Sequence, residues 1–138
     1  MKNLKLIALI ALTVVMISAS CKKKKEADPH VPPDVVFKTG SGYTTADRTI
    51  NKKDTITVGI TATKTEDDLK SYNVSYAYDG NATSTTFFNY VLNANEANSY
   101  SNDIKIIARN QTGTEKWIFS IVDRDGNLTQ KTIVLTVQ

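Results

Sequence analysis

The residues that enzymes use most often for proton transfer and nucleophilic attack are nearly missing from this chain of 138 residues. It contains one histidine, His30, and one cysteine, Cys21. A serine or cysteine hydrolase needs an imidazole beside its nucleophile, and a zinc site needs several thiolates or imidazoles together. His30 lies in a proline-rich stretch and Cys21 lies near the N-terminus. The composition therefore argues against both nucleophilic catalysis and a zinc site.

Carboxylates are the remaining candidates for chemistry, and they cluster at one point. Glu66, Asp67 and Asp68 are consecutive in the stretch KTEDDLKS, between two expected strands. A glycosidase needs two carboxyl groups that face each other across a cleft, about 5–9 Å apart. Adjacent residues on a loop of a small domain seldom form such a cleft. We expect a solvated connection there, and we predict a protein that is not an enzyme and has no cofactor.

A second group of acidic residues has the spacing of a calcium loop. Asp123, Asp125 and Asn127 alternate along the chain, and oxygens at alternate positions of a calcium loop turn towards one cation. The bidentate acid that completes an EF-hand is missing downstream, where residues 132–134 are expected to form a strand. Asp125-Gly126 is also a favoured pair for a tight type I′ turn. A hairpin turn is the favoured interpretation, and calcium binding by Asp123 and Asp125 is the weaker alternative.

Aromatic residues supply the candidate binding surface. Two neighbouring expected strands carry six of them: Tyr72, Tyr76, Tyr78, Phe87, Phe88 and Tyr90. Aromatic side chains on an exposed sheet can stack on sugar rings or anchor a protein partner. The first three share their phase with Val74, which favours burial in the core. Phe87 and Phe88 are successive and are expected on opposite faces, so we take Phe87, Phe88 and Tyr90 as the possible binding surface.

Residues 1–20 have the three parts of a signal peptide. Two lysines are followed by an almost entirely apolar run over residues 6–17 and then by small residues, and this run is shorter than the ~20 residues that a membrane-spanning helix needs. The stretch resembles a bacterial lipoprotein signal with its lipobox, although Ser18 stands where that family usually has an aliphatic residue. The resemblance implies cleavage before Cys21 and attachment of lipid to its thiol.

Residues 21–34 are expected to form a tether. They carry four successive lysines and then three prolines in DPHVPPD, and proline favours extended backbone. We expect the lysine run to be a solvated spacer that keeps the domain off the bilayer, with weak contact to anionic head groups as a secondary effect. The membrane is an expected partner through the N-terminal lipid. From residue 34 to 138, eleven Lys and Arg stand against twelve Asp and Glu, although the whole chain has a formal charge of +3. No basic face for nucleic acid is therefore expected.

From residue 35 onward, apolar and polar residues alternate with the period of a β-strand. Ile56, Val58 and Ile60, for example, alternate with threonine and glycine. Such patterns predict about seven strands, and no stretch has a helical repeat. Asp79-Gly80 and Asp125-Gly126 mark two hairpins. Together they predict an all-β fold, an immunoglobulin-like (Ig-like) antiparallel β-sandwich that spans residues 35–138.

The final third, WIFSIVDRDGNLTQKTIVLTV, resembles the last hairpin of bacterial Ig-like domains from surface proteins, including Bacteroidota lipoproteins. The disulfide of antibody domains is absent, so Trp117 is expected to be buried against aliphatic side chains. The resemblances imply a lipoprotein of the outer membrane or cell surface, with a non-enzymatic domain that acts as an interaction or structural module. Its expected partner is a protein or a glycan. The alternative is a small carbohydrate-binding lipoprotein that captures glycans.

Overall fold

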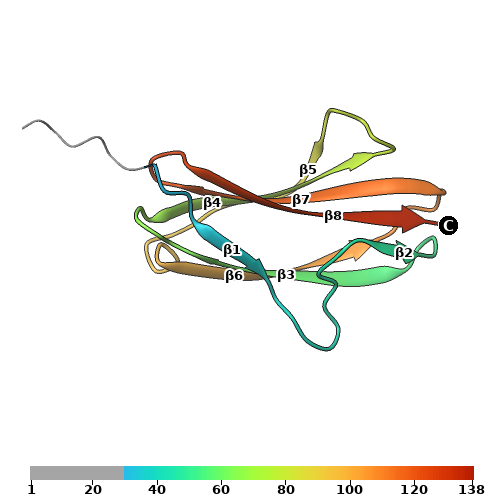
Figure 1. Ribbon diagram of the computed structural model, residues 1–138, viewed down its shortest axis with the longest axis horizontal. Coiled ribbons are helices and arrows are strands. Elements are labelled where there is room, and N and C mark those ends of the chain that lie inside the picture. Colours follow the sequence, from blue (N-terminus) through green and yellow to red (C-terminus); the bar gives the residue numbers. More distant parts are fainter. Residues whose placement is uncertain (1–29) are drawn as a thin grey trace, which may run out of the picture.

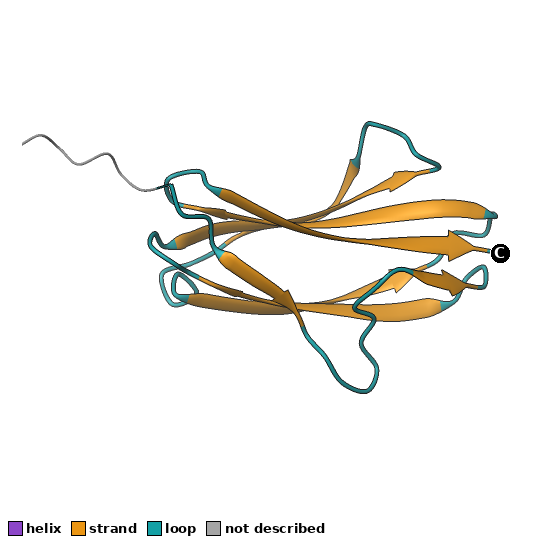
Figure 2. Ribbon diagram, in the orientation of Figure 1, coloured by secondary structure: helices purple, strands orange, loops and turns teal. Residues whose placement is uncertain are grey.

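The computed structural model describes residues 30–138. Cys21, the expected signal peptide and most of the expected tether lie outside the described residues. The described chain consists of β-strands and loops (Figures 1 and 2), and no helix in this range could cross a membrane. All strands lie between residues 34 and 137. The core between the sheets is therefore built from residues 34–137, and we expect residues 30–138 to fold alone.

Two sheets pack face to face to form a sandwich (Figure 1). The three-stranded sheet has the order β1 (Asp34–Phe37), β3 (Thr55–Thr63) and β6 (Ser99–Ile107). The five-stranded sheet has the order β2 (Arg48–Ile50), β8 (Leu128–Val137), β7 (Gly113–Asp123), β4 (Leu69–Tyr78) and β5 (Thr85–Val91). β5 and β6 are thus edge strands of opposite sheets.

The first two described strands, β1 and β2, belong to different sheets. β1 pairs antiparallel with β3, whereas β2 pairs in parallel with β8. β3 and β6 share one sheet, as strands B and E do in Ig-like domains. In the other sheet β8, β7, β4 and β5 follow one another, which is the order of strands G, F, C and C′ in those domains. The predicted all-β, Ig-like sandwich is confirmed. The described residues hold eight strands rather than the seven predicted. The sequence pattern missed β2, because this strand has a single buried residue, Ile50, and shows no alternation.

The core lies between the sheets and is built from the alternating residues. Ile56, Val58 and Ile60 of β3 are buried, and each fully buried side chain of this size contributes about 1.5–3 kcal/mol. The ring of Phe37 on β1 meets the ring of Phe119 on β7 edge-on, with centroids 5.7 Å apart. This contact joins the two sheets through the core.

The two Asp-Gly pairs form different turns. Asp79 and Gly80 have φ values of 52° and 76°, and the backbone N–H of Asn81 donates to the carbonyl of Tyr78 at 2.9 Å. The type I′ turn predicted there is confirmed. In the β7–β8 hairpin only Gly126 has a positive φ, 92°. The prediction of a type I′ turn is wrong for that hairpin, where a longer loop with one left-handed residue joins the strands.

The two ends of the sandwich differ in what they carry. At one end, the Thr65 hydroxyl donates to the carbonyl of Pro32 at 3.0 Å, and the Thr129 hydroxyl donates to the carbonyl of Pro33 at 2.6 Å. The first described residues are therefore bound to the β3–β4 loop and to the start of β8. We call this the tether end. The C-terminus lies at the opposite end, the far end (Figure 1).

Candidate functional site

An aromatic groove lies between the edge strands β5 and β6. Its cavity volume is about 220 Å³, and its lining residues come from four strands: Tyr76, Tyr78, Phe87, Lys105, Ile107 and Trp117. The exposed fraction is 37% for Tyr78, 49% for Phe87 and 67% for Ile107. Because each sheet ends at this side, no described strand covers these side chains. The groove therefore leaves apolar surface in water.

A bulge in β5 directs Phe87 into the groove. The successive β4 residues Val74 and Ser75 pair with Phe88 and Thr86, respectively. Phe87 is therefore left without a partner on β4. The Phe87 ring meets the Trp117 ring edge-on at 5.2 Å, and the Phe88 ring lies 5.8 Å from the ring of buried Tyr72. Both phenylalanines face the interior. The prediction of opposite faces is wrong, because a bulge adds one residue and resets the alternation.

Trp117 forms the floor of the groove and is 4% exposed. Its ring lies 5.2 Å from the rings of Tyr76 and Phe87, and its indole N–H donates to Glu115 Oε2 at 3.0 Å. Glu115 Oε1 accepts the backbone N–H of Arg109 at 2.8 Å, and the Glu115 side chain is fully buried. The predicted burial of Trp117 is confirmed, but its ring contacts Tyr76 and Phe87, whereas aliphatic neighbours were expected. The carboxylate that holds its indole was missed by sequence reasoning.

An ion pair fixes one wall of the groove. The Arg109 guanidinium donates to Asp79 Oδ1 at 2.5 Å and lies 4.7 Å from the centre of the Tyr78 ring. The hydrogen bond from Arg109 holds the pKa of the Asp79 carboxyl below its usual range, and burial raises the pKa of the Tyr78 phenol. Gly113 has a φ of 137°, and a Cβ there would overlap the Arg109 and Asp79 side chains. The absence of a side chain at Gly113 thus lets the ion pair form beside Tyr78.

Phe88 and Tyr90 pack against the core rather than lining the groove. The Tyr90 ring stacks on the Tyr100 ring at 5.7 Å with 20° between the planes, and the Phe88 ring lies 6.3 Å from the Tyr90 ring. The Tyr90 hydroxyl donates to Glu96 Oε2 at 3.1 Å. Of the three residues that the sequence marks as a possible binding surface, Phe87 lines the groove. Phe88 and Tyr90 are half-buried beside it.

The acidic residues of the β7–β8 loop stabilise the loop itself. Asp123 is buried, and its carboxylate accepts hydrogen bonds from the Asn127 backbone N–H at 2.7 Å and from the Asn127 side-chain amide at 2.9 Å. Asp125 accepts a bond from Arg124 Nε at 3.3 Å. Within residues 30–138, no three His, Cys, Asp or Glu side chains come together as a metal site requires. The geometry thus favours the turn interpretation of Asp123 and Asp125 over calcium binding.

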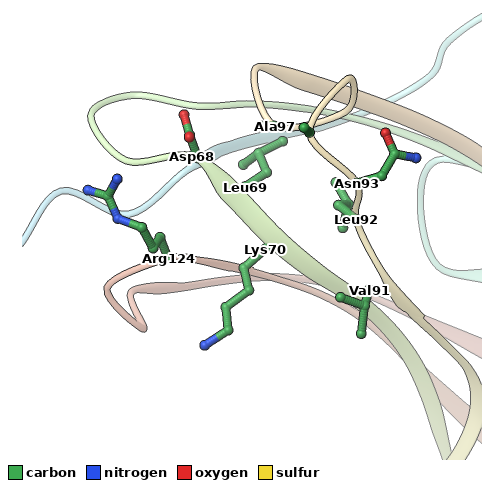
Figure 3. A pocket seen from close by; sticks show the side chains of 9 residues that line it. Asp68, Leu69, Lys70, Val91, Leu92, Asn93, Ala97 and Arg124 are labelled. Carbon is green, nitrogen blue, oxygen red and sulfur yellow. The ribbon is translucent and has the colours of Figure 1, made fainter.

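A more open cavity of about 260 Å³ lies at the tether end (Figure 3). Its cations are Lys70 and Arg124. Asp67, next to it, is buried and pairs with Arg124. Asp68 is half-buried and pairs with Lys64 at 2.9 Å, and this bond lowers the pKa of Asp68. The predicted solvated connection is wrong for Asp67, which is buried, and holds in part for Asp68, which is half-buried. The Asp67–Arg124 pair joins the β3–β4 loop to the β7–β8 loop, whereas the Lys64–Asp68 pair lies within the β3–β4 loop.

Comparison with known proteins gives similarities of fold. No protein-family model matches the sequence, and no curated protein matches it. The CARDB domain of the PF1109 protein from Pyrococcus furiosus, solved in complex with di-metal ions, is 12% identical with a TM-score of 0.49, over 82% of this chain and 99% of that chain. Murine CRIg is 14% identical with a TM-score of 0.40, over 77% and 98%. A chain of the complex between zinc 2-glycoprotein and prolactin inducible protein from human seminal plasma is 8% identical with a TM-score of 0.42, over 78% and 95%. At these identities the likeness concerns only the path of the chain.

Proposed function

We propose that this protein is a lipid-anchored binding module of the bacterial cell envelope, held on the outer membrane or cell surface through an acylated Cys21. Its Ig-like domain is a non-enzymatic interaction or structural module. The signal-like N-terminus and the single cysteine before four lysines support the anchor. Two or more acyl chains on one residue bind a membrane stably, whereas one chain binds it reversibly.

The aromatic groove is the observation that carries the binding function. Tyr78 and Ile107 are the last residues of β4 and β6. Both strands begin at loops of the tether end, where the backbone N–H of Leu69 donates to the carbonyl of Ala97 at 2.8 Å. The groove therefore lies towards the far end, away from an anchored N-terminus. A pocket with an aromatic floor and exposed apolar walls is typical of the centre of a protein interface.

A binding assay with residues 30–138 tests this function. Protein and glycan arrays should give binders whose affinity falls about tenfold or more in Ile107→Ala, because a buried apolar side chain of this size contributes about 1.5–3 kcal/mol. Val36→Ala is the matched control, since Val36 is 50% exposed on β1 at the other edge of the same sheet. Equal losses in the two variants, or none in Ile107→Ala, would contradict the groove.

The anchor needs a separate test in the full chain. Metabolic labelling with a palmitate analogue should tag the wild type and miss Cys21→Ser. An equally labelled Cys21→Ser variant would contradict the lipid anchor and leave the groove as a binding site.

Glycan capture is the second candidate function. The rings of Tyr78 and Phe87 are partly exposed, and sugar rings stack on such faces. The rings of the groove are not coplanar, because the planes of Phe87 and Tyr76 are inclined to that of Trp117 by 82° and 41°. A glycan would meet one ring at a time rather than a flat row. Binding confined to the glycan array would favour this function.

A further inference from the structure

The backbone of β5 is unpaired along its outer side. β5 lies at the edge of the five-stranded sheet, with β4 as its neighbour. The backbone N–H of Leu92 donates to the carbonyl of Lys70 on β4 at 2.9 Å. Because residues of an antiparallel ladder alternate in direction, the backbone groups of Tyr90 also face β4. The N–H and C=O groups of Asn89 and Val91 therefore point away from the sheet.

This edge lacks the charges that usually protect an edge strand. The sequence of β5, TTFFNYV, contains no charged residue and no proline, although lysine, proline and short length are the usual means of blocking an edge. β1 and β2 have four and three residues, and β6 contains Asp103 and Lys105. Among the strands within residues 30–138, β5 is thus the long edge strand without charge.

We propose that β5 pairs with an extended strand of a partner protein, and that an apolar side chain of this strand enters the aromatic groove. The inference rests on the proposed binding function and names the class of partner. A strand added beside β5 would exchange hydrogen bonds with Asn89 and Val91. Its residue opposite Tyr90 would point to the same face as Tyr90, and so would the residue two positions on, which lies opposite Phe88 and nearer to Phe87. The Phe87 ring and the groove lie on this face.

Charge indicates which strand fits. Lys105 lines the groove and has no carboxylate partner among residues 30–138. A partner with an acidic residue two positions from the apolar one would place a carboxylate on the same face, near Lys105. A second copy of this chain fits less well, because its β5 offers no carboxylate. Antiparallel pairing of two β5 strands would also place the two tether ends at opposite ends of the pair.

Selection from a random displayed heptapeptide library against residues 30–138 tests the pairing. Enriched peptides should carry an apolar residue two positions from Asp or Glu and no proline between them. Val91→Pro removes an outward N–H and spares the ladder to β4, because proline is tolerated where the N–H of an edge strand faces solvent. A selected peptide should bind Val91→Pro about tenfold more weakly, as expected for one lost hydrogen bond. Val91→Ala, which keeps the backbone donor, should retain most of the affinity.

Two further measurements support this test. Lys105→Glu should change the enriched residue from acidic to basic. In the wild type, the amide protons of Asn89 and Val91 should exchange more slowly once a selected peptide is bound. This readout also serves if Val91→Pro fails to fold.

Several results would overturn strand pairing. These are a library without binders, equal binding by Val91→Pro and Val91→Ala, or unchanged amide exchange. Glycan binding that is lost in Ile107→Ala and kept in Val91→Pro would overturn the strand and leave the proposed binding function intact. A dimer seen by sedimentation equilibrium in the wild type and lost in Val91→Pro would show that a second copy, rather than a partner protein, occupies the edge.

Discussion

Trp117→Phe separates the packing of the groove floor from its hydrogen bond. Phenylalanine keeps an aromatic ring but lacks the N–H that donates to Glu115 Oε2 at 3.0 Å. Glu115 is 0% exposed, so no solvent contacts this carboxylate in the native fold. A buried acceptor left without a partner costs about 1–3 kcal/mol, and more when it is charged. The smaller phenylalanine ring also packs less well than the indole. Together, these two losses should lower the free energy of unfolding of Trp117→Phe by about 2–4 kcal/mol.

Trp117→Ala should be far more severe, because it removes the ring as well. Truncation of a buried aromatic residue costs about 3–5 kcal/mol, and the loss of the donor to Glu115 Oε2 adds about 1–3 kcal/mol. The sum is comparable to the whole stability of a typical domain, about 5–15 kcal/mol. We therefore expect Trp117→Ala to be marginally folded or unfolded.

Urea unfolding followed by far-UV circular dichroism measures both changes. For an unfolding slope of about 2 kcal/mol per molar urea, the loss in Trp117→Phe should move the midpoint by about 1–2 M. Ile121→Val is the control, because it trims the same strand by one buried methyl group for about 0.5–1.5 kcal/mol and touches no polar partner. A midpoint for Trp117→Phe no lower than that of Ile121→Val would refute the role of the Glu115 hydrogen bond.

Three further variants test the loops and the ion pair. Asp123→Ala should lower the free energy of unfolding by about 2–4 kcal/mol, because two hydrogen bonds to Asn127 are lost at a buried site, and calcium should leave the Tm of the wild type unchanged. Gly113→Ala should destabilise more than Gly126→Ala in urea unfolding, since both glycines have positive φ but a Cβ meets other side chains only at Gly113; equal losses would contradict this. The folded-state pKa of Asp79 is lowered, so its contribution to stability is present above about pH 4 and is lost as the pH falls through the folded-state pKa. The free energy of unfolding should therefore decrease less steeply below about pH 4 in Asp79→Asn than in the wild type, and parallel curves would contradict the ion pair.

Alternation was enough to place most strands but not the buried charges. In a two-layer sandwich one face of each strand is buried, so the period of two in the sequence is the period of burial. Glu115 and Asp123 share the phase of Trp117 along β7, and phase alone would have marked them as buried. Their charge argues for exposure unless hydrogen-bond donors are close. These donors, the Arg109 backbone and Asn127, come from the adjoining turns, whose shape the sequence pattern does not determine.

The groove could be predicted only in part, because it joins two sheets. Phe87 was among the predicted binding residues, because two successive aromatic residues were expected to point to opposite faces of the sheet, which would expose one of them. Lys105 and Ile107 lie on β6 and come near Phe87 only when the edges of the two sheets meet. The bulge in β5 could not be predicted from the sequence either. The sequence TTFFNYV does not show which residue is extra, because this depends on the register between β4 and β5.

The bulge that turns Phe87 into the groove also limits the edge beside it. A long uncharged edge invites pairing with any exposed strand, including that of an identical chain. At Phe87 the ladder of β5 shifts by one residue, and a bulge bends the strand and increases its twist. The regular run of outward backbone groups is thereby confined to the part of β5 that contains Asn89 and Val91. A short run of this kind offers few hydrogen bonds, so a partner strand must add side-chain contacts in the groove to bind. Phe87, which supplies a wall of the groove, therefore also makes strand pairing at the β5 edge depend on the sequence of the partner.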